Sequence, residues 1–297
     1  MCCCHPSITE IWLQPCREDA DQGRERNGNH AEAAPTLRET VGVLSESQRS
    51  VFERDGILKL EGAFTSRDAE RMRDVMWNEL RRRHGIEQHE PSTWNLHPPT
   101  GMKSSKKSKV FEPILGPNVV GALDELFGAD CWMRPKNFGN VLITMPNASC
   151  WRVPHKVWHS DFEATAPTNR LFAVKVWALC GEVRPGGGGT PQLAGSHTLF
   201  ARYLKGDVDR EYKAAKHGFL RSHPWLKELT RDDGDDPDRN ARFLDAEADI
   251  DGLPARVVEL TGNPGDVFIT HAWVFHSIAV NAQNKPRLMR SFAVRAG

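Results

Sequence analysis

From residue 131 to the end, the sequence is dominated by short β-branched, aromatic and aliphatic runs that are separated by glycine, proline and asparagine. Runs of this length and composition are typical of β-strands. Eight of them are present, at residues 141–145, 153–161, 171–179, 191–193, 256–260, 266–270, 277–280 and 286–295. Eight short strands favour a double-stranded β-helix, a cupin-like jelly roll whose two facing sheets leave a mouth for a metal and a small molecule.

The rest of the chain divides around these strands. Residues 1–43 are rich in charged and small polar residues, and predict a disordered N-terminal leader. Residues 44–130 predict helices that flank the sheets and 131–297 the jelly-roll core, so that 44–297 form one mainly β domain. Residues 198–255 are charged and helix-prone, and predict an insertion beside the mouth of the barrel. Whether this insertion forms a lid is left open.

The expected helices carry start and stop signals. Ser45 and Gln48 have the spacing of a capping box, and Gly128 is a C-terminal stop. The helices are expected at residues 45–54, 66–84 and 118–127, with a short strand at 57–60.

The composition excludes several classes of partner. Lysine plus arginine and aspartate plus glutamate number 39 each, so no net charge attracts nucleic acid or an anionic membrane. No run approaches the ~20 apolar residues that a membrane-spanning helix requires, and the N-terminus lacks the pattern of a secretory signal. We therefore expect a cytoplasmic protein that acts on a small-molecule substrate, with no nucleic-acid or membrane partner. The oligomeric state is left open.

Seven cysteines, an odd number without a Cys-x-x-Cys pair, argue against a disulfide framework. Three of them form the run Cys2-Cys3-Cys4, which is either part of the leader or a site for a soft metal or an acyl group. The role of this run is left open.

A single His-x-Asp sequence occurs in the chain, at His159 and Asp161. In an extended strand, residues two apart point to the same face, so both side chains can reach one ion. A second imidazole, His276, follows the turn Pro264-Gly265-Asp266 and an apolar run. Two histidines and a carboxylate are the ligands of the facial triad that holds non-haem Fe(II). The alternative is an exposed strand that binds no metal.

Arg287 lies eleven residues after His276. A guanidinium there could hold the far carboxylate of a dicarboxylate co-substrate with two hydrogen bonds. Lys175 and Trp177 share one face of the expected strand 171–179. Lys175 is therefore either a second cation for that carboxylate or a lysine whose ammonium reaches solvent.

Two other histidines compete as ligands. His155 has the strand parity of His159, but it follows a proline, which favours a surface or supporting position. His271 lies five residues before His276 and hence on the opposite face of a continuous strand. The offset to Arg287 also favours His276.

With these residues the sequence resembles the phytanoyl-CoA dioxygenase family of Fe(II)/2-oxoglutarate oxygenases. The resemblance rests on Trp158-His159-Ser160-Asp161, on Gly195-Ser196-His197, and on Gly265-Asp266 followed by His276, Asn281 and Arg287. It covers residues 44 to 295.

The resemblance implies that His159, Asp161 and His276 bind Fe(II), that Arg287 and Trp177 bind the co-substrate 2-oxoglutarate, and that O2 is the oxidant. It implies a dioxygenase that hydroxylates a small organic molecule with release of succinate and CO2. Desaturation, cyclisation and epimerisation use the same iron site and stay open, as does a non-catalytic cupin-type protein that binds a metal or a small molecule. Trp177 has core packing as its alternative, and the identity of the substrate is left open.

Two further segments look like binding motifs but lack what those motifs need. Residues 186–189 are four glycines without the Lys-Ser/Thr of a phosphate-binding loop, which favours a tight turn into the next strand. Residues 232–238 are acidic but lack the closing glutamate of a calcium loop, which favours an exposed acidic turn.

Overall fold

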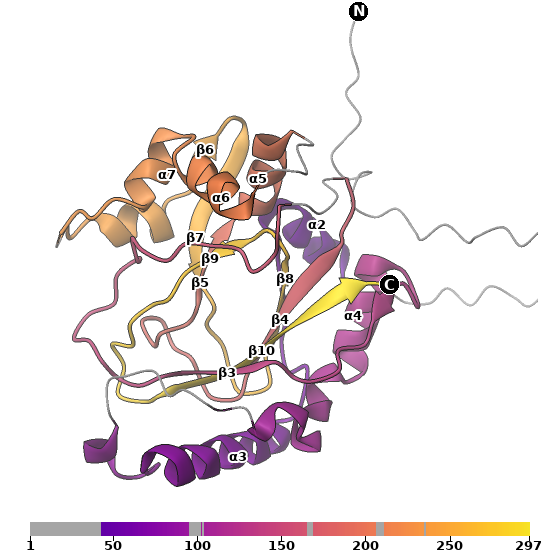
Figure 1. Ribbon diagram of the computed structural model, residues 1–297, viewed down its shortest axis with the longest axis vertical. Coiled ribbons are helices and arrows are strands. Elements are labelled where there is room, and N and C mark those ends of the chain that lie inside the picture. Colours follow the sequence, from indigo (N-terminus) through magenta and orange to yellow (C-terminus); the bar gives the residue numbers. More distant parts are fainter. Residues whose placement is uncertain (1–42, 95–101, 103, 165–168, 206–210, 235) are drawn as a thin grey trace, which may run out of the picture.

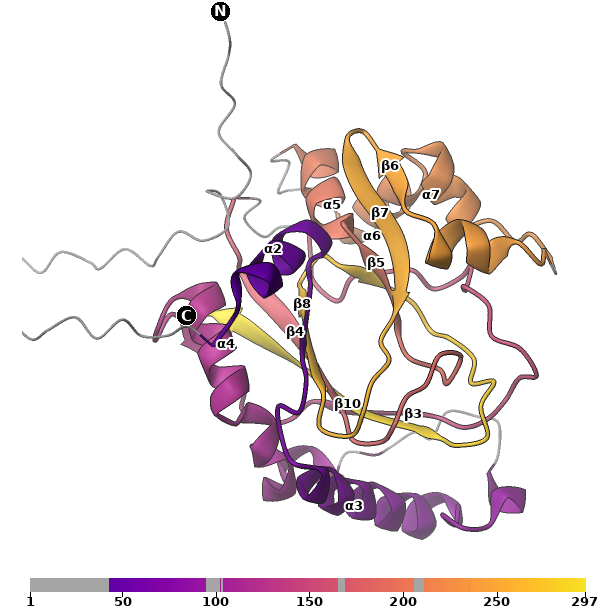
Figure 2. The same ribbon diagram turned by 180° about the vertical axis from the view of Figure 1, so that it is seen from behind.

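Two antiparallel sheets face each other in the part of the chain that the structure describes (Figures 1 and 2). The structure is a computed structural model that describes residues 43–94, 102, 104–164, 169–205, 211–234 and 236–297. The predicted leader, with the run Cys2-Cys3-Cys4, therefore lies outside the described residues except for Val43.

The larger sheet has the strand order β1-β8-β4-β10-β2, with β3 also paired to β10, and the smaller sheet has the order β6-β7-β5-β9. The strands are β1 (Ile57–Leu60), β2 (Trp132–Met133), β3 (Asn140–Thr144), β4 (Ala173–Leu179), β5 (Pro191–Ala194), β6 (Ala248–Ile250), β7 (Leu253–Glu259), β8 (Val267–His271), β9 (Phe275–His276) and β10 (Arg287–Ala296).

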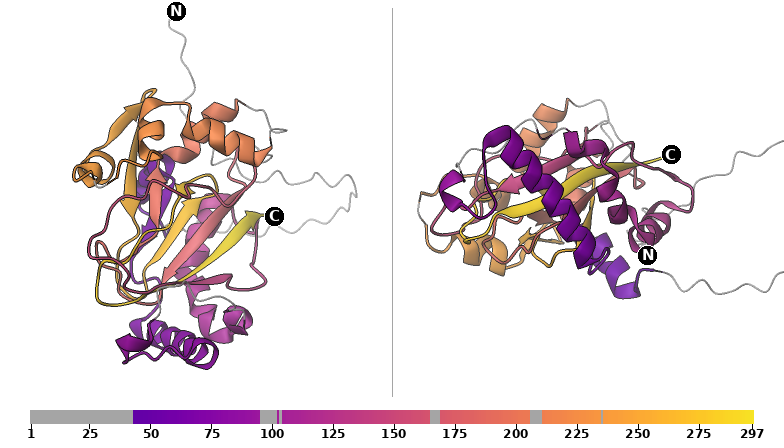
Figure 3. Two further views of the ribbon diagram at one scale, coloured as in Figure 1. Left: turned by 60° about the vertical axis from the view of Figure 1, so that its left-hand side comes forward. Right: turned by 90° about the horizontal axis from the view of Figure 1, so that it is seen from below.

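Helices lie on the outer faces of both sheets. They are α2 (Glu46–Asp55), α3 (Ser66–His84), α4 (Pro117–Phe127), α5 (Ser196–Leu204), α6 (Tyr212–Leu220) and α7 (Pro224–Leu229), with 3-10 helices η1 (Pro91–Thr93), η2 (Ser104–Lys107) and η3 (Lys109–Leu115) and a π-helical turn η4 (Ala241–Asp245). Helix α3 crosses the larger sheet, as the right-hand view of Figure 3 shows. Helices α5, α6 and α7 gather over the smaller sheet at the top of Figure 1.

The expected helices form for the reasons that the sequence indicates. The Ser45 hydroxyl accepts from the Gln48 amide, and the Gln48 side chain accepts from the Ser45 amide, which completes the capping box of α2. This helix ends at Gly56, whose φ of 71° is left-handed. A Cβ at this glycine would lie 2.6 Å from the ring of His197, so a larger residue has neither the backbone conformation nor the space.

Strand β4 shows how the two sheets are built. Val174, Val176 and Ala178 pack outward in the same core cluster as α3 and α4. Trp177 and Leu179 pack inward in a second cluster, together with residues of the smaller sheet. Because side chains alternate along a strand, Lys175 also points inward. The space between the two sheets is therefore the interior of a barrel, and this interior is where β4 directs Lys175 and Trp177.

Two of the expected strands are wrong. In residues 153–161 the structure has an isolated bridge at His159 and no continuous strand. Pro154 lacks an N–H for a ladder, and Val157 has a φ of 63°, which a strand cannot contain. Residues 277–280 are not a strand either, because the partner strand β5 begins at Pro191, which offers no N–H to extend the pairing.

Candidate metal centre

Three side chains singled out by the sequence, His159, Asp161 and His276, converge next to β9. Each offers one ligand atom, and these atoms lie within 4.8 Å of one another. The Nε2 atom of His159 lies 3.6 Å from one carboxylate oxygen of Asp161, and the Nε2 atom of His276 lies 3.4 Å from the other. Two imidazoles and a carboxylate that share so small a volume form a donor set that suits Fe(II) and related transition metals.

Backbone pairing holds the two histidines together. Each donates its amide N–H to the carbonyl of the other, at N···O distances of 3.0 and 2.8 Å. On its other side, His276 pairs in register with Gln192 of β5. The convergence of the two rings therefore follows from the sheet, although the first histidine lies on a single bridge and not on the continuous strand that the sequence predicted.

Hydrogen bonds fix the orientation of both imidazoles. Nδ1 of His159 lies 2.8 Å from the carbonyl of Val157, and Nδ1 of His276 lies 3.3 Å from the carbonyl of Val274. A carbonyl only accepts, so Nδ1 must carry the proton in both rings, and Nε2 keeps its lone pair. The two Nε2 atoms are those that face Asp161, which is the arrangement that a metal ligand needs.

The electrostatic environment favours the neutral imidazole. Burial lowers the pKa of His276 well below its usual value, and the positive charge of Lys175 acts in the same direction. Burial also lowers the pKa of His159. The charges of Lys175 and Lys216 act in the same direction, and the hydrogen bond to Val157 acts against them. Neutral imidazoles are the form that binds a metal.

Lys175 and Trp177 lie against the three side chains. The Lys175 ammonium donates to Oδ2 of Asp161 and sits 4.5 Å from the centre of the Trp177 ring. Burial lowers the pKa of Lys175 to about 8. The Trp177 ring contacts His276 at 5.1 Å between centroids, and its indole N–H donates to the Thr270 hydroxyl at 3.0 Å. The Lys175 ammonium is therefore bound to Asp161 and not directed only to solvent. Trp177 packs in the inner core cluster and also contacts His276.

Arg287 lies inside the barrel. It is 8% exposed, and its two terminal nitrogens donate to the hydroxyls of Thr190 at 2.9 Å and Thr144 at 2.6 Å. Its Nε has no hydrogen-bond partner within the described part of the chain. Burial lowers the pKa of Arg287 to about 10, while the carboxylate of Glu259 acts in the opposite direction. Sequence reasoning missed both threonines, because an isolated threonine in a strand carries no signal of its own.

The competing residues lie elsewhere. Nε2 of His155 lies 3.3 Å from a carboxylate oxygen of Asp232, and His155 is not one of the three residues whose ligand atoms converge. His271 packs against His197, with 5.0 Å between ring centroids, and not against His276. Arg290, three residues after Arg287, points to the opposite face of β10, where it contacts Ser105 and stacks on Phe111.

The buried pair formed by His197 and His271 predicts acid sensitivity. Burial lowers the pKa of His197 to about 4, whereas an unfolded histidine titrates near 6.5. Between these values the unfolded chain binds more protons than the folded protein. The free energy of unfolding therefore decreases as the pH is lowered, by about 2 kcal/mol from this residue between pH 7 and pH 5.

Urea unfolding at both pH values checks this prediction. Glu259, whose pKa burial raises to about 6, changes the stability in the opposite direction. The comparison is therefore between wild type and His197→Gln, in which Glu259 is unchanged. We expect the variant to lose less stability on acidification, and equal losses in both proteins would contradict the prediction.

The segment 198–255 contacts the centre through Tyr212, at the start of α6. Its hydroxyl accepts from the Ser160 amide at 2.8 Å and donates to the Ser160 carbonyl at 2.6 Å. Ser160 stands between His159 and Asp161, so this one phenol holds the peptide that connects two candidate ligands. Sequence reasoning missed this contact, because 52 residues separate the partners.

The glycine run and the acidic turn have internal partners. The amides of Gly186 and Gly189 donate to the carboxylate of Glu259 at 2.8 and 2.9 Å.

The acidic turn is held by an arginine, because the buried guanidinium of Arg239 donates to Asp233 at 2.6 Å. At Asp233 the turn is therefore less exposed than the sequence predicted. Residue 235 of the turn lies outside the described residues.

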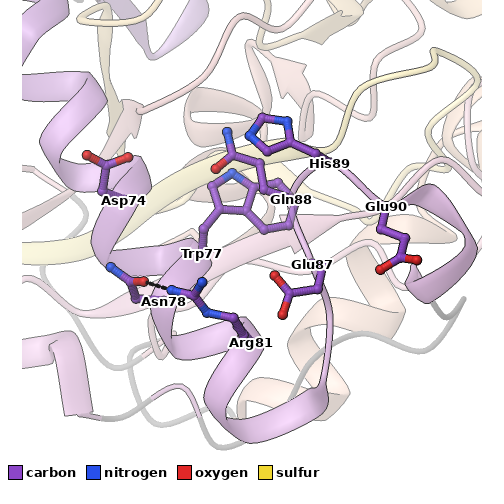
Figure 4. Close-up of a pocket in the computed structure, with 8 residues that line it drawn as sticks. All are labelled: Asp74, Trp77, Asn78, Arg81, Glu87, Gln88, His89 and Glu90. Carbon is purple, nitrogen blue, oxygen red and sulfur yellow. Dashed lines mark hydrogen bonds between the residues drawn. The ribbon is translucent and has the colours of Figure 1, made fainter.

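A cavity of about 860 Å³ lies apart from the centre, between the solvent-facing side of α3 and residues 87–90. Figure 4 shows its lining, in which Arg81 and Asn78 are hydrogen-bonded to each other and the ring of Trp77 forms the floor. Its lining comes only from α3 and residues 87–90 and includes none of the three converging residues. It is therefore not part of the candidate metal centre.

No protein-family model and no curated protein matches the chain. Among solved structures, the apo form of EctD from S. alaskensis is 17% identical with a TM-score of 0.50, and the match covers 86% of this chain and 79% of EctD. SnoK, a non-heme alpha-ketoglutarate-dependent carbocyclase from nogalamycin biosynthesis, is 16% identical with a TM-score of 0.49, covering 85% of this chain and 84% of SnoK.

HygX from Streptomyces hygroscopicus, solved with nickel and 2-oxoglutarate bound, is 14% identical with a TM-score of 0.49, covering 85% of this chain and 87% of HygX. The likeness to EctD and the two facing antiparallel sheets with flanking helices confirm the predicted jelly-roll fold. Within the described residues, the structure contains no helix that is both long and apolar enough to cross a membrane.

Proposed function

We propose that this protein is an Fe(II)- and 2-oxoglutarate-dependent dioxygenase that hydroxylates a small organic molecule and releases succinate and CO2. The observation that carries the proposal is that one barrel interior holds both a cluster of two imidazoles and a carboxylate and a buried guanidinium, that of Arg287.

The three clustered residues fit a divalent iron. His159 and His276 present unprotonated Nε2 atoms to the same point, and Asp161 supplies the anionic oxygen. The side chain of Asp161 is 34% exposed, which leaves the carboxylate open to an entering ion. That ion would compete with the Lys175 ammonium for Oδ2 of Asp161. Three protein ligands leave positions open for a co-substrate and for oxygen.

Arg287 fits the far end of a dicarboxylate. Its partner Thr190 directly precedes β5 and lies two residues from Gln192, which is the residue paired with His276. Two residues of strand span ~7 Å, a distance that a five-carbon diacid can bridge between the metal centre and the guanidinium. The hydroxyls of Thr190 and Thr144 can rotate to donate to the same carboxylate.

When bound together, Fe(II) and 2-oxoglutarate supply the oxidising chemistry, in which one atom of O2 enters succinate and the other enters a C–H bond of the substrate. The chain itself does three things. His159, Asp161 and His276 fix the ion, Arg287 orients the co-substrate, and the apolar walls around Trp177 exclude water from the space between them.

Succinate formation in the absence of a primary substrate tests the proposal. We expect slow, uncoupled turnover of 2-oxoglutarate that requires Fe(II), O2 and the protein together. In Asp161→Ala the metal loses its anionic ligand, so turnover should fall to the background of free iron. Succinate formed at the wild-type rate by this variant, or by wild type without Fe(II), would contradict the proposed function.

A further inference from the structure

Unpaired polar atoms line the interior between the three clustered residues and Arg287. The side chain of Gln192 is completely buried, yet neither its Nε2 nor its Oε1 has a hydrogen-bond partner in the described chain. Ser291 is 4% exposed, and its Oγ is likewise without a partner among those residues. Together with Nε of Arg287, four unpaired polar atoms belong to residues of this one region.

The sheet register shows that Gln192 points inward. Two residues away along the chain are Thr190, which directly precedes β5 and bonds to Arg287, and Ala194 of β5, which packs in the inner core cluster with Trp177. Residues two apart share a face of a strand, so Gln192 shares this inward face. Ser291 lies opposite Trp177 in the register of β10 with β4, on the same inner side.

A buried and unpaired carboxamide destabilises a folded protein, because the group has lost its water without gaining a partner. A methionine or leucine would fill the same place at no such cost. An amide offers two donors and one acceptor, and the oxygens of a 2-oxo acid are acceptors. The missing partner of Gln192 is therefore best supplied by a ligand that enters the barrel.

We propose that Gln192 binds the 2-oxo acid end of the co-substrate, with its amide N–H groups donating to the oxygens held next to the metal. This inference rests on the proposed function and deepens it. Gln192 pairs directly with His276, whereas Thr190, the partner of Arg287, lies two residues earlier in the chain, directly before β5. Gln192 and Arg287 thus recognise opposite ends of one molecule.

The experiment compares two acids that share one end. 2-Oxoglutarate has the far carboxylate, and 2-oxobutyrate lacks it. Both are titrated without oxygen into the Fe(II)-loaded protein, and binding is followed by calorimetry and by the visible absorption of the iron complex. The variant Gln192→Met keeps the length of the side chain and removes the amide. Gln88→Met, at an exposed glutamine of the cavity in Figure 4, is the matched control.

We expect Gln192→Met to weaken the binding of both acids by about tenfold, the effect of losing one hydrogen bond to a charged group. Its melting temperature without ligand should equal or exceed that of wild type, because an unpaired amide has been removed. Gln192→Glu should weaken both acids further, because a carboxylate there repels theirs. Arg287→Ala should weaken only 2-oxoglutarate, and Gln88→Met neither acid.

Two results would overturn the inference while leaving the proposed function standing. One is wild-type affinity for both acids in Gln192→Met and Gln192→Glu. The other is a loss confined to 2-oxoglutarate, which would place Gln192 at the far carboxylate. If wild-type protein loaded with Fe(II) bound neither acid, the proposed function itself would fall, and the inference with it.

Discussion

Replacing His276 by alanine is expected to weaken Fe(II) binding by roughly a hundredfold or more. Loss of a residue that only supports a metal ligand typically costs about 10–100-fold in affinity, so the loss of a ligand should cost at least as much. In this variant two ligands remain, and the ion gains no other donor from β9, because the neighbouring Phe275 is apolar. Calorimetry under anaerobic conditions measures the affinity directly.

His155→Ala is the matched control for this prediction. His155 lies near the centre in sequence but pairs with Asp232 and takes no part in the cluster. Its replacement should leave Fe(II) affinity unchanged. Full affinity in His276→Ala, or a comparable loss in His155→Ala, would show that the three clustered residues are not the metal ligands.

Replacing Arg287 by alanine is expected to weaken 2-oxoglutarate binding by at least tenfold while Fe(II) affinity hardly changes. A charge-assisted hydrogen bond to a carboxylate contributes ~1.5–3 kcal/mol, and the guanidinium can offer two of them. The metal ligands are not touched by this change. Arg287→Lys should restore only part of the affinity, because an ammonium cannot reproduce the planar fork.

Titration of the Fe(II)-loaded variants with 2-oxoglutarate measures this effect. If Arg287→Ala bound 2-oxoglutarate as tightly as wild type, the anchor would have to be Lys175, which also points into the barrel. Arg290 could not take over, since it faces the helices and is held by Ser105.

Much of the fold could be predicted from the sequence, because alternation and capping are local. The capping box at Ser45 and Gln48, the glycine stop at Gly128 and the shared face of Lys175 and Trp177 all depend on residues close together in the chain. The predictions of strands at 153–161 and 277–280 were wrong for two reasons. A hydrophobic pattern does not reveal the positive φ of Val157, and it does not reveal the residue at which a partner strand begins.

The candidate site was only partly predictable. The sequence indicated His159, Asp161, His276 and Arg287, since their residue types and spacing match a known chemistry. It could not indicate Tyr212, because the contact with Ser160 bridges 52 residues and depends on how the insertion packs. Gln192 was also missed, because a lone glutamine in a strand has no pattern, and only the fold shows that it is buried beside His276.

Anaerobic titration of the wild-type protein with Fe(II) and 2-oxoglutarate tests the central claim most directly. If His159, Asp161 and His276 hold the metal and leave positions open for the 2-oxo acid, a weak visible charge-transfer band should appear only when both are present. The band should be absent in His276→Ala and should need more 2-oxoglutarate in Arg287→Ala. A wild-type protein that binds Fe(II) and 2-oxoglutarate without this band, or that binds neither, would contradict the account.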